Sequence, residues 1–275
     1  MRQEHPLAAL LKAAGLSRST FYYHLKNTEG EDAHAGLKVQ IRSIYGRHRG
    51  CYGYRRIAAQ IRRNGDAVNH KKVQRLMQSM GLKSVVRPKK YRSYRSGPNA
   101  AAPNVLQRQF NADQPNQRWA TDVTEFNIKG EKLYLSPVLD LYNGEIIAYQ
   151  TSRRPAFAMV STMLKKAIDK LGPDDRPLLH SDQGWQYRMP TYRQQLAARQ
   201  ITQSMSRKGN CLDNAAMESF FGTLKSEFFY LTQFDSIEQL QQGIRRYIHY
   251  YNHDRIKLKL KGLSPVQYRT QASGA

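Results

Sequence analysis

The sequence predicts a mixed α/β domain preceded by a basic region built of short helices. Up to residue 81, apolar residues recur at helical spacing between glycine breaks. Beyond residue 111 the pattern changes to alternation, and the elements follow the order of three strands, helix, strand, helix, strand and helix. That order is typical of a mixed sheet rather than of a doubly wound parallel one.

The positive charge is concentrated in the amino-terminal part. Residues 1–110 contain 22 Lys and Arg against 5 Asp and Glu, whereas residues 111–275 contain 22 against 16, out of a net charge of +23. Such an excess indicates a polyanionic partner, and double-stranded DNA fits it best. The alternative is a solvated basic face that serves solubility.

Composition also excludes several classes of protein. No apolar run reaches the roughly 18–20 residues of a membrane span, and the first residues show no secretory pattern, so we expect a cytoplasmic protein with no membrane partner. Cys51 and Cys211 are too few for a disulfide framework or for a zinc site, which needs about four ligands. Any metal ion must therefore be held by oxygen atoms.

Residues 1–30 predict a short helix-turn-helix-like segment. Leucines at helical spacing begin a first helix at residue 7, and Gly15 interrupts the pattern. Ser17 is expected to cap a second helix that reaches residue 25. Taken alone, the pattern also fits any helical hairpin.

Residues 36–82 predict a helical DNA-binding domain, and residues 83–112 a basic linker. The last helix of this domain should be capped by Asn69 and closed by Gly81. The helices are expected at residues 37–48, 54–63 and 70–80.

The outward face of the third of these helices carries candidate DNA contacts. Lys71, Lys72 and Arg75 would supply donors for phosphates and for base edges in a major groove. The alternative is an ordinary solvated helix face.

The α/β core is expected over residues 113–234 and a carboxy-terminal helical extension over residues 235–275. Asn143-Gly144 between two apolar runs is a strong hairpin signal. The expected strands cover residues 118–128, 133–141, 145–151, 177–181 and 201–205, and the expected helices residues 156–171, 191–199 and 212–230.

Three acidic residues stand out by their surroundings. Asp122 lies within an expected strand, Asp182 ends a buried strand, and Glu218 lies beside two phenylalanines on the long helix. Carboxylates are rarely buried unless they are paired or bind a metal. Each alone fits a capping or ion-paired residue, whereas the three together indicate a functional site.

The segments around these carboxylates resemble the acidic motifs of the DDE transposases and retroviral integrases. Asp182 and Glu218 are separated by 35 residues, and Lys225 follows Glu218 by seven. The chain most resembles the larger, integrase-like subunit of the IS-three family of bacterial insertion-sequence transposases, over about residues 7 to 269. The segments that carry the resemblance are Trp119–Thr124, His180–Tyr187, Ser206–Phe221, Tyr52–Ile57, Tyr250–Arg255 and Gly262–Tyr268.

This resemblance implies a ribonuclease-H-like core and a DNA transposase. Members of this family hydrolyse DNA at the 3′ ends of an insertion sequence. The freed 3′-hydroxyl then attacks another phosphodiester, which first forms a circular intermediate. The partners implied are the terminal inverted repeats and target DNA, further copies of the chain on DNA, and a small helix-turn-helix protein from the upstream frame, as a partner or a fusion. The expected location is the bacterial cytoplasm, at the nucleoid.

Strand cleavage and joining call for two metal ions. Two Mg²⁺ ions about 3.5–4 Å apart stabilise the attacking and the leaving oxygen, and Mn²⁺ is expected to substitute. Mg²⁺ prefers oxygen ligands and keeps several waters, so three carboxylates suffice. Asp122 is expected to bridge the ions, with Asp182 and Glu218 each completing one site.

Other residues receive roles around this centre. At about 100° per residue, Lys225 falls on the same side of its helix as Glu218 and would hold a phosphate, unless it is an ordinary exposed lysine. Asp213 is expected to cap the long helix together with Asn214. His180 is expected to be a packed histidine rather than a base. The loop expected to approach DNA carries Arg207, Lys208 and Asn210, and the aromatic residues Trp185 and Tyr187 would either stack on an unpaired base or anchor the core.

Two other functions remain compatible with the sequence. The chain could be a DNA-binding regulator whose α/β domain has lost catalysis, although the complete acidic set argues against it. It could also be a nuclease of the same fold that does not join strands, because cleavage and joining use one set of metal ligands.

Overall fold

The computed structural model describes residues 5–29, 32–86, 111–206 and 214–273. The chain begins with helices α1 (Leu7–Ala13) and α2 (Arg18–Glu29), separated by Gly15 at a φ of 62°. Ser17 Oγ accepts a hydrogen bond from the Thr20 amide at 3.1 Å, which confirms the predicted cap. Helix α2 continues to Glu29, beyond its expected end at residue 25.

Helices α3 (Ala35–Arg47), α4 (Tyr54–Arg63) and α5 (His70–Ser79) form a unit with its own hydrophobic core. Both predicted caps of α5 are confirmed. Asn69 Oδ1 accepts a hydrogen bond from the Lys71 amide at 2.8 Å, and Gly81 adopts a φ of 69°, which a residue with a β-carbon rarely does.

One six-stranded mixed sheet forms the centre of the second unit. Its strands run in the order β2-β3-β1-β5-β6, and β4 pairs with the other side of β3. The pairs of β3 are antiparallel, whereas β1–β5 and β5–β6 are parallel. The strands are β1 (Arg118–Thr121), β2 (Thr124–Ile128), β3 (Glu131–Asp140), β4 (Ile146–Ser152), β5 (Leu178–Ser181) and β6 (Thr202–Met205).

The strand expected over residues 118–128 is interrupted at Asp122 and Val123, which corrects the prediction of one continuous strand. Both β1 and β2 pair with β3 in one unbroken register, which leaves Asp122 opposite Pro137. Proline has no N–H to donate to the ladder, and the Pro137 carbonyl accepts from Thr121 Oγ1 at 2.9 Å. The ladder therefore opens where the carboxylate lies.

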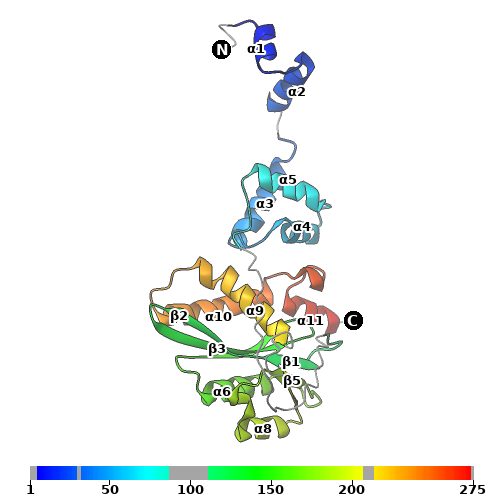
Figure 1. Ribbon diagram of the computed structural model, residues 1–275. Coiled ribbons are helices and arrows are strands. Elements are labelled where there is room, and N and C mark those ends of the chain that lie inside the picture. Colours follow the sequence, from blue (N-terminus) through cyan, green and yellow to red (C-terminus); the bar gives the residue numbers. More distant parts are fainter. Residues whose placement is uncertain (1–4, 30–31, 87–110, 207–213, 274–275) are drawn as a thin grey trace.

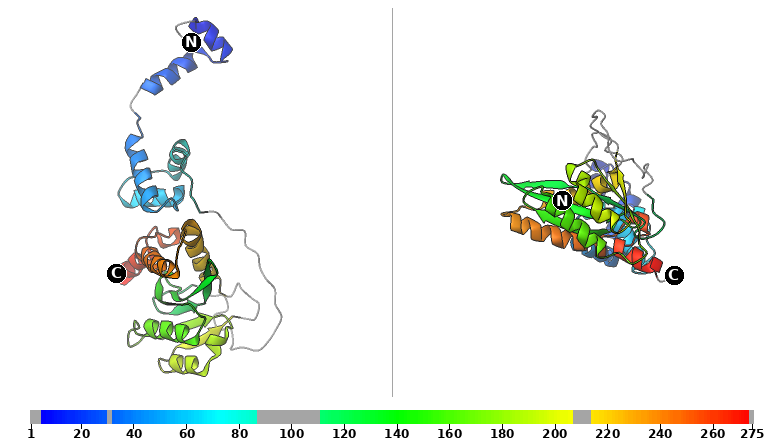
Figure 2. Two further views of the ribbon diagram at one scale, coloured as in Figure 1. Left: turned by 90° about the vertical axis from the view of Figure 1, so that its left-hand side faces the viewer. Right: turned by 90° about the horizontal axis from the view of Figure 1, so that it is seen from below.

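Helices cover both faces of the sheet (Figure 1). One face packs on α6 (Phe157–Ile168), α7 (Trp185–Arg188) and α8 (Pro190–Ala197), and the other on α9 (Ala215–Glu227) and α10 (Ile237–His253). Figure 2 shows that α9 and α10 lie between the sheet and the α3–α5 unit. None of the helices that the structure describes is both long and apolar enough to cross a membrane.

The helix expected over residues 212–230 is shorter than predicted. Helix α9 ends at Glu227, and a 3₁₀ turn at Phe229–Leu231 follows. Phe228 leaves the helical conformation at φ −132° and its ring stacks on Tyr247 at 5.5 Å between centroids. A second 3₁₀ turn (Leu258–Leu260) and helix α11 (Pro265–Ser273) complete the described chain.

The outer edge of the sheet is partly closed by α10. Strand β4 has β3 on one side only. The side-chain amide of Asn252 donates to the Ile146 carbonyl and accepts from the Ile146 amide, both at 2.9 Å. It thereby mimics the backbone of a neighbouring strand.

The α3–α5 unit contacts the core through a seam of buried polar groups, defined here by His48, Tyr52 and Arg56 on one side and Glu227, Tyr250 and Arg255 on the other. Tyr52 Oη accepts from the Ile256 amide at 2.9 Å, and His48 Nδ1 bonds Tyr250 Oη at 2.8 Å. The His48 and Tyr52 rings stack at 3.7 Å.

Glu227 is the centre of this seam. Arg255 donates to both of its oxygens at 2.6 Å, and Arg56 donates across the seam at 3.2 Å. Glu227 and Arg255 are only 7% and 5% exposed. Burial alone raises the pKa of Glu227, but the hydrogen bonds and charges of the two arginines outweigh it and lower the pKa.

We predict that Glu227→Gln strongly destabilises the protein, because it leaves Arg255 buried without a counter-charge. Removing one partner of a buried pair costs about 3–5 kcal/mol. The free energy of unfolding in urea measures the loss. Glu238→Gln is the control, since it breaks a surface pair with Arg153 and should change little. Equal effects of the two substitutions would contradict a structural role for the buried pair.

His48 makes the seam sensitive to acid. Burial and the charges of Arg47 and Arg56 lower its pKa to about 4, against a smaller opposing effect of Glu227. The unfolded chain therefore binds the proton more tightly, and stability falls as the pH drops from about 6.5 towards 4. We predict that His48 contributes a loss of about 2 kcal/mol between pH 7 and pH 5.

The measurement compares urea unfolding at both pH values for the wild type and for His48→Phe, which keeps a ring against Tyr52 and cannot titrate. The variant should lose less stability on acidification than the wild type. An equal loss in both proteins would assign the acid sensitivity to other groups.

Candidate active site

The parallel pairing of β1 with β5 brings two of the predicted carboxylates to one edge of the sheet. The register pairs Ala120 with His180. Asp122 and Asp182 each follow that pair by two residues, where the strands end. Side chains two positions apart in a strand point to the same face, so the two aspartates leave neighbouring strands in equivalent positions.

Asp122 lies in an electrostatically unfavourable place for a carboxylate. Burial, followed by the negative charge of Asp182 and then of Glu218, raises its pKa to about 7. Its Oδ1 accepts a hydrogen bond from the Val123 amide at 2.7 Å, which only partly offsets the cost. The negative charges of Asp182 and Glu218 both act on the Asp122 carboxylate.

Asp182 is held by the loop that follows it. Its Oδ1 accepts a hydrogen bond from the Gly184 amide at 2.8 Å, and burial raises the pKa of the carboxyl group. A β-carbon at residue 184 would lie 2.9 Å from that same oxygen, so a larger residue there would force the Asp182 carboxylate to shift. Of the two aromatic residues of this loop, Trp185 is 48% exposed, whereas Tyr187 is buried in the core.

Glu218 is brought to the carboxyl ends of these strands by the start of α9. It lies in the first turn of that helix, and burial raises its pKa. Asn214 does not cap α9 with its side chain, contrary to prediction. Its amide instead donates to the Thr121 carbonyl at 3.2 Å, which ties the helix start to the end of β1. Asp213 lies outside the described residues.

The three carboxylates suit hard divalent cations by their chemistry. They supply oxygen atoms only, and none of them forms an ion pair with a cation of the described residues. A bound cation would relieve the mutual repulsion that raises the pKa of Asp122. Within the described ranges, no group of three or more acidic, histidine or cysteine side chains is placed so that it could hold one metal ion.

Lys225 and His180 are two further residues for which the sequence predicts a role. Lys225 Nζ lies 5.3 Å from the centre of the Phe126 ring. His180 is fully buried, and its ring nitrogens bond Ser204 Oγ at 2.9 Å and Ser206 Oγ at 3.1 Å. His180 is thus a packed histidine, as predicted.

The predicted DNA contacts divide into described and undescribed residues. On α5, Lys71 and Arg75 are exposed and Lys72 is half-buried, while Val73, Leu76 and Met77 face the core of the unit. The helix therefore presents its basic face outward, as the sequence predicts. The contacts expected from the other loop lie outside the described residues: Arg207, Lys208 and Asn210.

Sequence reasoning missed the seam. The segments Tyr52–Ile57 and Tyr250–Arg255 resembled family motifs without an assigned task. The structure shows that they meet each other at Glu227. The helical spacing of Tyr247, Tyr251 and Arg255 was the available signal, because it places a charged group in line with a buried aromatic stripe.

Known families match almost the whole described chain. The HTH-like domain matches residues 31–90, and two integrase core domain descriptions match residues 112–211 and 218–272. The chain is 56% identical over 271 residues to the InsK protein of insertion sequence element IS150 from Escherichia coli K12, which covers 98% of this chain and 96% of that protein.

Less similar relatives are also named as transposases of insertion sequences. The transposase for IS904 from Lactococcus lactis is 35% identical over 234 residues, covering 84% of this chain and 92% of its own length. The transposase InsF for IS3A from Escherichia coli K12 is 33% identical over 223 residues, covering 80% and 77%.

Solved integrases are similar at lower identity. The HTLV-2 integrase catalytic core domain in complex with magnesium covers 57% of this chain and 98% of its own, at 19% identity and a TM-score of 0.47. The BIV integrase catalytic core domain covers 58% and 97%, at 17% identity and a TM-score of 0.45.

The two parts of the chain agree with these matches. The helical unit of α3–α5 coincides with the HTH-like match, and the mixed sheet with helices on both faces coincides with the integrase core. The ribonuclease-H-like core predicted from the sequence is therefore confirmed. From its similarity to InsK and InsF over most of its length, the chain belongs to the IS3 family of insertion-sequence transposases, enzymes that process nucleic acid.

Proposed function

We propose that this transposase cleaves the 3′ ends of an insertion sequence and joins them to DNA, with two Mg²⁺ ions held by Asp122, Asp182 and Glu218. Mn²⁺ is expected to replace Mg²⁺. The observation that carries the proposal is the flush register of β1 and β5, with α9 tied to the end of β1. It supports a shared site because Asp122 and Asp182 directly follow β1 and β5, and Glu218 lies in the first turn of α9, although the three residues are far apart in the sequence.

Each acidic residue has a role that follows from its position. Asp122 lies where the hydrogen-bond ladder between β1–β2 and β3 is interrupted. Because the charges of both Asp182 and Glu218 act on its carboxylate, it is the group suited to bridge two ions. The Gly184 amide keeps one Asp182 oxygen turned into the loop and leaves the other for a ligand. Bound Mg²⁺ would stabilise the charge that develops on the attacking and leaving oxygens of the phosphodiester.

The positively charged parts of the chain supply DNA binding. The exposed basic face of α5 suits a major groove, and Lys225 follows the acidic helix face two turns from Glu218. We further propose that the partners are the terminal inverted repeats and target DNA, that several copies assemble there, and that a small upstream-frame protein assists as a partner or a fusion. Activity at the bacterial nucleoid follows from these partners.

We predict that Asp122→Asn, Asp182→Asn and Glu218→Gln each reduce cleavage and joining by at least about a thousandfold, because each removes a ligand charge. DNA affinity should stay within a few-fold of the wild type. The assay incubates the full chain with labelled end DNA and Mg²⁺ or Mn²⁺ and reads nicked and joined strands separately.

Asp169→Asn is the matched control, since it neutralises an exposed carboxylate at the end of α6. Normal activity in any of the three variants would remove that residue from the site. Nicks without joined strands would identify a nuclease of this fold, and DNA binding without either product would identify a regulator.

We predict that replacing Lys71, Lys72 and Arg75 together by Gln weakens DNA binding and flattens its salt dependence. Each phosphate contact that is lost lowers the slope of log affinity against log salt concentration by about 0.9 on duplex DNA. Fluorescence anisotropy at several salt concentrations measures the slope.

The control replaces three exposed basic residues on the far side of the sheet, Lys165, Arg193 and Arg199. The control protein should keep the slope of the wild type. An unchanged slope in the α5 variant would place the phosphate contacts on another surface.

A further inference from the structure

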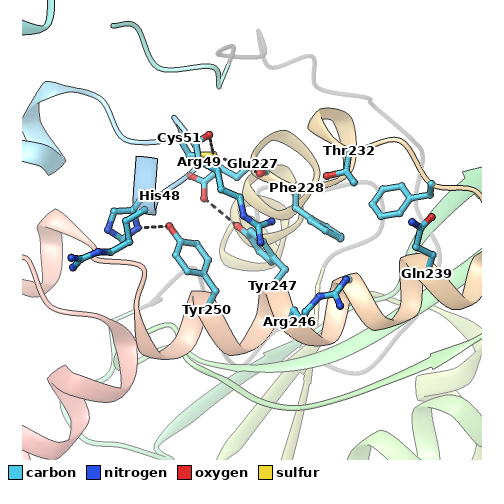
Figure 3. Close-up of a pocket in the computed structure, with 13 residues that line it drawn as sticks. His48, Arg49, Cys51, Glu227, Phe228, Thr232, Gln239, Arg246, Tyr247 and Tyr250 are labelled. Carbon is cyan, nitrogen blue, oxygen red and sulfur yellow. Dashed lines mark hydrogen bonds between the residues drawn. The ribbon is translucent and has the colours of Figure 1, made fainter. Parts of the chain in front are cut away.

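A pocket opens at the seam between the α3–α5 unit and the core (Figure 3). His48 and Cys51 line it from the helical unit, Phe228 from the residue that follows α9, and Tyr247 from α10. Its volume is about 210 Å³, far more than the ~30 Å³ that one water occupies in the liquid. It is also smaller than the usual chamber for a drug-sized ligand. The space therefore fits a single ring system.

The walls of this seam pocket are aromatic. The Phe228 ring stacks on Tyr247 and makes an edge contact with Phe234, at 5.5 and 5.3 Å between centroids. Gly243 makes room for this arrangement, because a β-carbon there would lie 2.4 Å from Phe228 Cζ. Flat apolar walls of this kind accept an aromatic ring by stacking.

The rim of the seam pocket is positively charged. Arg49 and Arg246 flank Phe228 in Figure 3, and both are exposed. Neither forms an ion pair within the part of the chain that the structure describes. Among the described residues that line the pocket, the one carboxylate is Glu227, which is already neutralised by Arg255 and Arg56. The opening thus offers two guanidinium groups to an anion.

Polar groups at the mouth complete the site. Thr232 and Gln239 lie at the opening, opposite His48. Gln239 Oε1 already accepts a hydrogen bond from the Asp235 amide at 2.7 Å, so Gln239 offers its N–H groups, and Thr232 its hydroxyl group, to the edge of a heteroaromatic ring. The pocket therefore combines aromatic side chains for stacking, hydrogen-bond partners for the edge of a ring, and an anion site, all within a volume that suits a small ligand.

We propose that the seam pocket binds one unpaired nucleotide, with its base against the aromatic wall and its phosphate on Arg49 and Arg246. Base stacking on aromatic side chains beside arginines is the chemistry by which proteins hold single-stranded nucleic acid. The nucleotide could belong to a DNA strand or be free in solution. The site goes beyond the proposed cleavage and joining, which use the other end of α9.

The test measures binding of the full chain in EDTA, so that no strand is cut. The probes are a blunt duplex, the same duplex with a short single-stranded extension, and dAMP. We expect the extended duplex or dAMP, or both, to bind to the seam pocket, with affinity about tenfold lower in Arg246→Gln and in Arg49→Gln. An effect on the extended duplex identifies a DNA strand as the source, and an effect on dAMP alone identifies a free nucleotide.

Arg245→Gln is the matched control. It removes the same charge from the adjacent position of α10, which lines a different groove, beside β4. The control should bind every probe like the wild type. The proposal is overturned if Arg246→Gln and Arg49→Gln bind dAMP and the extended duplex as the control does. It is equally overturned if they weaken blunt and extended duplexes by the same factor, since the arginines would then contact paired DNA.

Discussion

The candidate active site depends on the parallel hydrogen bonding of β1 with β5. Neither strand is long, and their pairing register alone determines that Asp122 and Asp182 leave the sheet side by side. A slip of one residue would turn one of the two carboxylates to the opposite face. The buried residues on both faces of the sheet resist such a slip, because it would move Trp119 or Leu179 out of its packed position and onto the opposite face. Packing of the core thus maintains the geometry of the site.

The sequence allowed the order of elements and the acidic site to be predicted because both depend on local patterns. Asn69 and Gly81 delimit α5 through short-range backbone chemistry, and alternation marks the strands. The interruption at Asp122 was not predictable in this way. It depends on Pro137, which lies far along the chain and becomes a neighbour only when β3 pairs. Likewise, the early end of α9 depends on the tertiary partners of Glu227 and Phe228.

The seam explains why motifs at the two ends of the chain resembled a family without suggesting a chemical step. Tyr52 and Arg56 come from the helical unit, and Tyr250 and Arg255 from the end of α10. These side chains hydrogen-bond across the seam and hold the helical unit on the core, so their role is structural rather than catalytic. Because α9 carries Glu218 near its start and Glu227 at its end, one rigid helix connects the acidic site with the DNA-binding unit.

The contact of Asn252 with β4 bears on how copies of this transposase come together. A bare sheet margin invites a second molecule to extend the sheet by its own strand. Here the polar atoms of the Ile146 peptide groups are already saturated, and α10 runs beside them. At Ile146 the groups to which a strand of a second molecule would bond are therefore already taken, so strand addition at this end of β4 would first have to displace the Asn252 side chain.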